Sequence, residues 1–154
     1  MTTAAATEQD RELELELTFP PKPEYVSTAR HTVAALARLH EVPDEVVEDI
    51  KLAVSEACTN AVAANAKVGE DDPVRVVAMV EDDAMIIEVF DVAGIDPGVL
   101  DRDPEFDSEE HSFERGLSLP LLRGLVDSLD VRPREGRGAI LRMRLALGDP
   151  TSSA

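Results

Sequence analysis

The sequence contains no tryptophan, and aromatic residues make up only 3% of it. Its core must therefore be built from aliphatic side chains, and a module that binds sugars or bases by aromatic stacking is disfavoured. Cysteine is also scarce, because Cys58 is the single one and an internal disulfide is excluded. Cys58 lies beside an apolar helical stripe, which predicts a small core residue and not a nucleophile.

Basic residues and long apolar runs are also lacking. Only 15 lysines and arginines stand against 32 acidic residues, which gives a formal net charge of −17. This charge disfavours nucleic-acid phosphates and anionic membranes as partners. No apolar run approaches the roughly 20 residues that span a bilayer, and the N-terminus lacks the basic flank and apolar stretch of a signal peptide. We therefore expect a soluble cytoplasmic protein.

The length and the apolar content suit one folded domain. The chain has 154 residues, of which 44% are hydrophobic, enough to build an ordinary core. The first and last residues are small and polar, which is typical of frayed termini. We predict a single domain over residues 12–147, with disordered tails at 1–11 and 148–154.

The periodicity of apolar residues changes several times along the chain. A period of two predicts strands, and a spacing of three to four predicts helices. The expected elements are a strand at 12–19, helices from Glu24 to before Pro43 and at 44–67, strands at 74–80 and 85–91, a loop at 92–113, a helix at 116–129, and strands at 130–132 and 139–147. This order predicts an α+β two-layer sandwich, in which helices cover one face of a mainly antiparallel sheet.

Two polar residues of the second predicted helix have a suggestive spacing. Glu56 and Asn60 are four residues apart, so they share a helix face beside the apolar stripe. A carboxylate and a carboxamide are oxygen ligands of the kind that Mg²⁺ accepts. The same spacing also fits two solvated residues on an amphipathic helix, and the spacing alone leaves both interpretations open.

Four segments of the sequence occur in an order that is typical of a known family. They are Pro23–Val26, Ile50–Val62, Asp91 at the end of a strand, and Gly116-Leu117 at the start of a helix. In this order they resemble the anti-sigma factor serine/threonine kinases of the histidine-kinase, gyrase and Hsp90-like ATPase family. The resemblance spans about residues 12–147 and implies the histidine-kinase-like ATPase fold.

The resemblance also implies ATP and Mg²⁺ as cofactors. Asn60 would bind the Mg²⁺ that bridges to the phosphates, and Glu56 would be the general base for a serine hydroxyl. Asp91 would accept the adenine amino group. Two loops would complete the nucleotide site, with Gly94 on the adenine side and Arg115, Gly116 and Leu117 on the phosphate side. The helix that follows Gly116 would direct its N-terminus at the phosphates, as helix N-termini bind anions.

The function that the resemblance implies is an anti-sigma regulatory factor with ATP-dependent serine kinase activity. Such a protein would bind a sigma factor, phosphorylate an anti-anti-sigma antagonist and form a homodimer. The alternative is a non-catalytic module of the same fold that acts only by protein binding. It is favoured by Ala93 and Ser118, which replace glycines typical of the family, and by the acidic loop over 101–110. A histidine-kinase catalytic domain is a third, weaker alternative, because no phosphoacceptor hairpin precedes the domain.

The C-terminal arginines and Asn65 lead to two further expectations. The C-terminal third is rich in arginine, and these cations could orient a partner or pair internally with the acidic loops. Asn65 lies near the apolar side of the second predicted helix, close to its end. For Asn65 we expect a role in a cap or turn and not in ligand binding.

Overall fold

The computed structural model describes residues 13–67, 72–91, 118–134 and 138–147. Its secondary-structure elements follow one another as the periodicity predicts. In chain order they are β1 (Leu15–Phe19), the 3-10 helix η2 (Pro23–Tyr25), α1 (Val26–Leu39), α2 (Asp44–Lys67), β2 (Val74–Glu81), β3 (Ala84–Asp91), α4 (Ser118–Leu125), β4 (Ser128–Pro133) and β5 (Ala139–Ala146). The predicted tails and the loop at 92–113 lie outside the described residues.

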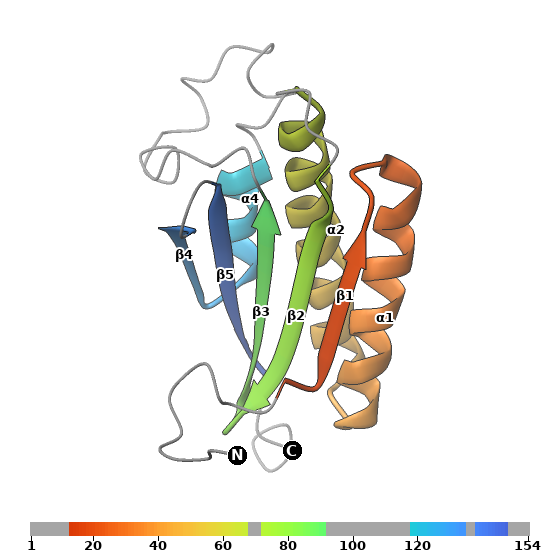
Figure 1. Ribbon diagram of the computed structural model, residues 1–154. Coiled ribbons are helices and arrows are strands. Elements are labelled where there is room, and N and C mark those ends of the chain that lie inside the picture. The colour runs from red at the N-terminus through yellow and green to blue at the C-terminus, as the bar shows by residue number, and fades with distance from the viewer. Residues whose placement is uncertain (1–12, 68–71, 92–117, 135–137, 148–154) are drawn as a thin grey trace, which may run out of the picture.

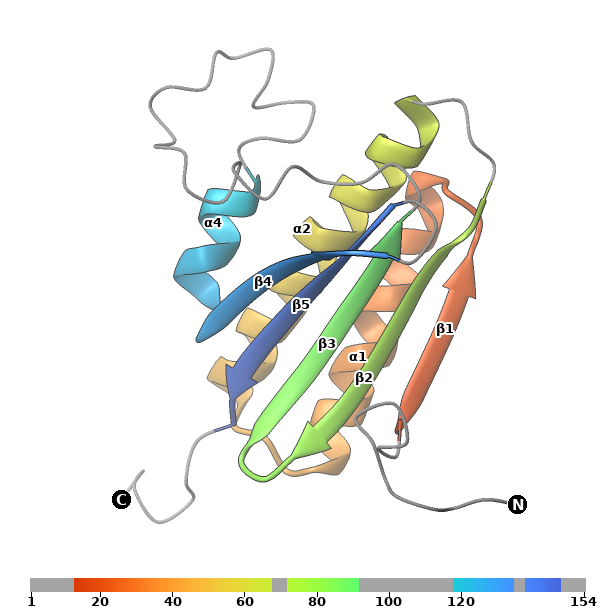
Figure 2. The same ribbon diagram turned by 60° about the vertical axis from the view of Figure 1, so that its left-hand side comes forward.

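The described strands form one sheet in the order β1-β2-β3-β5-β4, and all neighbouring strands are antiparallel. α1, α2 and α4 lie on the same side of this sheet (Figures 1 and 2). α2 is the central helix, because it packs against α1, α4 and β3. The predicted α+β two-layer sandwich is confirmed.

The core lies between the sheet and the helices, and it is aliphatic as the composition predicts. Alternate residues of β3, such as Met85, Ile87 and Val89, are buried against the helices. Ile50 and Val54 of α2 are fully buried in the same cluster. The core-facing residues of the strands, which alternate with period two, therefore pack against the apolar stripes of the helices, which repeat every 3.6 residues.

One predicted boundary is wrong. The helix expected at 116–129 ends at Leu125, and β4 begins at Ser128. Asp127 donates its backbone N–H to the carbonyl oxygen of Arg144, and Leu129 lies opposite Met143 in the β4–β5 ladder. Since Leu125 and Leu129 are four apart, the spacing fits a helix, but pairing with β5 takes the second leucine into the sheet.

α1 ends in a Schellman motif at an unusual residue. The N–H of Val42 donates to the carbonyl of Ala37, and that of Glu41 donates to the carbonyl of Arg38. Glu41 takes the left-handed conformation, with φ of 57°. This position favours glycine, because a side chain there crowds the following carbonyl.

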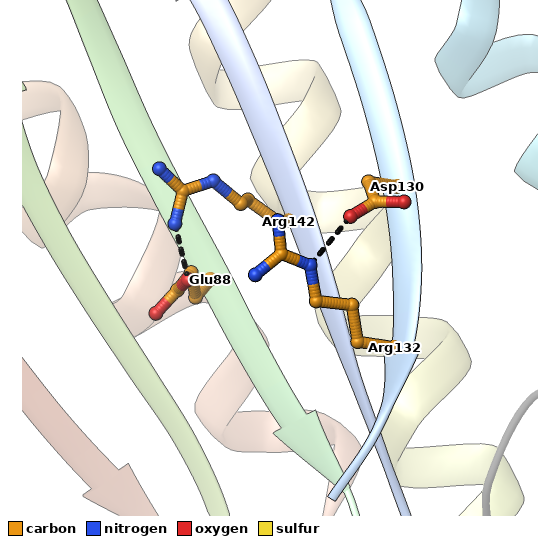
Figure 3. A network of polar contacts seen from close by, with 4 residues as sticks. All are labelled: Glu88, Asp130, Arg132 and Arg142. Atoms are coloured by element: carbon orange, nitrogen blue, oxygen red, sulfur yellow. Dashed lines mark hydrogen bonds and ion pairs between the residues drawn. The ribbon is translucent and has the colours of Figure 1, made fainter. Parts of the chain in front are cut away.

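The sheet face that the helices leave open carries several ion pairs. Arg142 donates to Glu88 over 2.8 Å, and Arg132 donates to Asp130 over 2.7 Å (Figure 3). On the same face Arg75 donates to Glu16 over 2.6 Å. Of the two roles left open for the C-terminal arginines, the described residues show internal pairing. The partner of Arg142 is on the neighbouring strand β3, that of Arg132 is on β4 itself, and Arg144 pairs with Asp83 in the β2–β3 turn, so strand carboxylates take part as well as those of turns.

Candidate functional site

The face of α2 that carries Glu56 and Asn60 flanks the core. Asn60 is buried, with 5% of its surface exposed, and Ala64 one turn later is buried at 4%. Ala64 nevertheless lies outside the main apolar cluster. Glu56, one turn before Asn60, is half-buried. The interpretation of a solvated pair is therefore wrong for Asn60, whose side chain is withdrawn from water.

The buried carboxamide of Asn60 differs from that of Asn65 in its hydrogen bonds. None of the hydrogen bonds between described residues involves it, whereas the Asn65 Nδ2 atom donates to the Asp72 carbonyl over 3.1 Å. Burial of an amide without a hydrogen bond costs free energy, so such groups in native proteins usually serve a ligand or a water. The Asn60 oxygen suits a Mg²⁺ that takes its other ligands from phosphates and water.

Asn65 behaves as predicted. Its side chain is fully buried, and its bond to Asp72 ties the end of α2 to the residue two positions before β2. It acts in a turn contact, as the sequence suggests, and the two buried asparagines of α2 thus have different roles.

Asp91 is the last residue of β3, and its side chain is buried at 1% exposure. The end of β3, the C-terminal half of α2 and the start of α4 lie at the same end of the molecule (Figure 1). Asp91 thus ends β3 at the end of the molecule toward which the C-terminal half of α2, the half that contains Asn60, extends. This arrangement suits a ligand with one polar group for each of them.

Arg134 contacts the end of β3, and sequence reasoning did not single it out. Its Nη1 atom donates to the backbone carbonyl oxygen of Asp91 over 2.8 Å. Its guanidinium carbon lies 5.5 Å from the centre of the Phe90 ring. The only signal in the sequence is that it belongs to the arginine-rich C-terminal third, which does not distinguish it from Arg132 or Arg142.

Cys58 is a core residue and not a nucleophile. It is fully buried, and desolvation raises the pKa of its thiol from 9.0 to about 12. A thiol reacts as the thiolate, so this environment suppresses nucleophilic chemistry. Within the part of the chain that the structure describes, no group of three or more histidine, cysteine or acidic residues could hold a metal ion.

The remaining predicted site residues lie outside the described residues. They are Gly94, Arg115, Gly116 and Leu117. Their roles in the nucleotide site stay predictions, as do the catalytic role of Glu56 and the ligand roles of Asn60 and Asp91. Among the described helices, none is long and apolar enough to cross a membrane.

Comparison with known proteins places this arrangement in a family. A profile of the histidine kinase-like ATPase domain matches residues 19–145. The serine-protein kinase RsbW of Bacillus pumilus is 37% identical over 129 residues, which cover 79% of this chain and 80% of the relative. The anti-sigma F factor of Clostridium acetobutylicum is 32% identical over 139 residues, which cover 88% of this chain and 96% of the relative.

A solved structure supports the fold independently. The crystal structure of the SiaB–SiaC complex from Pseudomonas aeruginosa contains a chain that matches with a TM-score of 0.63 at 12% identity. The match covers 89% of this chain and 92% of that one, so it extends over the whole sandwich. The family expected from the order of the sequence segments is confirmed by the domain profile and the two relatives. The chain belongs to the histidine kinase-like ATPase family, in the group of the RsbW serine-protein kinases and anti-sigma F factors.

Proposed function

We propose that this protein is an ATP-dependent protein serine kinase that acts as an anti-sigma factor. The observation that carries the proposal is the buried carboxamide of Asn60, which has no hydrogen-bond partner among the described residues and lies one helical turn beyond the half-buried Glu56. A polar group withdrawn from water without a protein partner is best explained by a ligand that satisfies it.

ATP with Mg²⁺ is the ligand whose chemistry fits both buried groups. Asn60 would supply one oxygen to Mg²⁺, which neutralises the phosphates when it is bound. Asp91 would accept a hydrogen bond from the adenine amino group. By family resemblance, Gly94 would lie beside the adenine, and Arg115, Gly116 and Leu117 would lie beside the phosphates.

Glu56 would act as the general base. Within the described part of the chain its carboxylate forms no hydrogen bond or ion pair, so it is available to take a proton from a substrate serine hydroxyl. Its half-buried position one turn from Asn60 keeps it near the phosphates but open to a protein substrate. Catalysis would then consist mainly of positioning and charge neutralisation.

The partners follow from the names of the relatives, which are a serine-protein kinase and an anti-sigma F factor. The protein would bind a sigma factor and phosphorylate the anti-anti-sigma antagonist that competes for it. By resemblance it would act as a homodimer. The role implies a cytoplasmic location, since sigma factors act on RNA polymerase.

The non-catalytic alternative leaves the burial of the Asn60 carboxamide unexplained. A module that had lost nucleotide binding would bury this carboxamide without compensation, and selection for stability would favour an apolar residue there. The buried asparagine therefore favours a site in use.

Isothermal titration with ATP and Mg²⁺ tests the proposal. We expect the unmodified protein to bind, and Asn60→Ala to bind at least ten times more weakly in the presence of Mg²⁺. Leu52→Ala is a matched control, because Leu52 lies on α2 but is 49% exposed. Absence of binding in the unmodified protein would eliminate the kinase, and unchanged binding by Asn60→Ala would eliminate the metal-ligand role.

A further inference from the structure

Arg134 connects the β4–β5 turn to the end of β3. It follows β4 directly, and its backbone N–H donates to the carbonyl of Gly138 over 3.0 Å. Its side chain donates to the carbonyl of Asp91 over 2.8 Å and is part-buried at that contact. Residues 43 positions apart in the chain are therefore joined beside the buried carboxylate.

The two ladders that flank β3 end at different residues. Asp91 lies opposite Ala139 of β5, but the β2–β3 register ends one residue earlier, at Arg75 and Phe90. At Asp91 the carbonyl oxygen accepts the hydrogen bond of Arg134, just beyond the last β2–β3 register pair. A hydrogen bond from a guanidinium is charge-assisted and stronger than one between neutral groups, so Arg134 supplies restraint where the ladder stops.

The Phe90 ring orients the arginine. The guanidinium carbons of Arg134 and Arg75 lie 5.5 and 4.7 Å from its centre, within the range of cation–π attraction. Arg75 is held in turn by Glu16 over 2.6 Å. The planar group of Arg134 is therefore positioned by two contacts, one with the ring and one with the Asp91 carbonyl.

We propose that Arg134 is a positioning residue for base recognition, which fixes the backbone of Asp91 and thereby aims its carboxylate at the nucleotide base. This inference rests on the proposed function, in which Asp91 accepts a hydrogen bond from adenine. A hydrogen bond requires placement of the acceptor to within a few tenths of an ångström, and small displacements at a site are costly. Arg134 does not touch the base itself.

Selectivity between ATP and GTP reports the position of the Asp91 carboxylate. Adenine carries an amino group where guanine carries a carbonyl oxygen, which a carboxylate repels. We expect Arg134→Ala to weaken ATP binding about tenfold, equivalent to about 1.4 kcal/mol, and to leave the weaker GTP binding unchanged. Arg134→Lys retains one donor and the charge but not the planar fork, so it should recover part of the selectivity.

Arg132→Ala is the matched control, because Arg132 lies on β4 two residues earlier and pairs with Asp130 over 2.7 Å. It should leave the ratio of ATP to GTP affinity unchanged. In the nucleotide-free protein, amide hydrogen exchange at Phe90 and Asp91 should be faster in Arg134→Ala than in Arg132→Ala. This readout does not depend on nucleotide.

The outcomes separate the two proposals. If the unmodified protein binds ATP but Arg134→Ala keeps its selectivity, or loses ATP and GTP binding equally, the positioning role is overturned and the kinase proposal stands. If the unmodified protein binds no ATP, the proposed function is overturned, and the positioning role with it.

Discussion

Arg142 and Glu88 lie directly opposite each other on β5 and β3, and the arginine donates to the carboxylate over 2.8 Å. Their side chains are 22% and 17% exposed, whereas those of the neighbouring pair Arg132 and Asp130 are 56% and 53% exposed (Figure 3). The two pairs share one sheet face and differ in their access to water. They therefore allow a test of how burial changes the contribution of an ion pair.

Removal of the less exposed pair should destabilise the fold more. We expect Arg142→Ala to lower the free energy of unfolding by about 1–2 kcal/mol, because it leaves Glu88 poorly solvated. Arg132→Ala should lower it by less than about 1 kcal/mol, as for exposed pairs. Urea denaturation measures both values, and equal losses would contradict the dependence on burial.

The two buried asparagines of α2 should respond oppositely to alanine. Asn60→Ala removes a buried carboxamide that no described residue hydrogen-bonds, and it improves helix propensity, so the free energy of unfolding should stay constant or rise. Asn65→Ala removes the hydrogen bond to the Asp72 carbonyl, and should lower the free energy of unfolding by about 1 kcal/mol. Thermal denaturation without nucleotide measures the difference. A clear loss of stability in Asn60→Ala would mean that its carboxamide serves the fold.

The proposed base is tested by a substitution that retains its shape. Glu56→Gln keeps the size of the side chain but cannot accept a proton at neutral pH. We expect phosphotransfer to the antagonist to fall by about 10²–10⁴-fold while the affinity for ATP and Mg²⁺ stays within a factor of about two. Radiolabel transfer and calorimetry measure the two quantities. Full phosphotransfer by Glu56→Gln would exclude the residue as the base.

Cys58 should make the stability fall at alkaline pH. Burial raises the pKa of its thiol from 9.0 to about 12, so between these values the unfolded chain loses the proton and the folded protein keeps it. The free energy of unfolding should therefore decrease by about 1.4 kcal/mol per pH unit above pH 9 through this group, and be unaffected by it below. Denaturation at pH 8 and pH 10 measures this. Cys58→Ala should lack this component, and an identical alkaline loss in both proteins would contradict it.

The cap of α1 offers a stabilising change. Glu41 occupies the left-handed position of the Schellman motif, with φ of 57°. Glu41→Gly should raise the free energy of unfolding by about 0.5–1 kcal/mol, because glycine adopts this conformation without crowding. Glu41→Ala keeps the crowded Cβ and serves as the control. A gain for alanine equal to that for glycine would show that the backbone conformation is not the cause.

The spacing of apolar residues predicted most of the helices and strands, because it indicates which face of each element is buried. The alternation of β1 and the apolar stripes of α1 and α2 specify the faces that must turn away from water. The exception is informative. Leu125 and Leu129 fit a helical spacing, but the hydrogen bonds of Asp127 and the pairing of Leu129 with Met143 place the second residue in β4. A spacing of four does not reveal which strand lies nearby.

The sequence by itself determined the aliphatic core, the α+β sandwich and the family, since these depend on composition, periodicity and a continuous motif on one helix. The tertiary structure alone decided that the Asn60 carboxamide is buried with no hydrogen-bond partner in the described part of the chain, that Asn65 donates to the Asp72 carbonyl, and that Arg134 donates to the Asp91 carbonyl. The physical reason is that burial and hydrogen bonding depend on which distant residues pack together. Arg132 and Arg134 are two residues apart in one arginine-rich segment. Only the fold shows that Arg134 contacts the end of β3 whereas Arg132 pairs with Asp130.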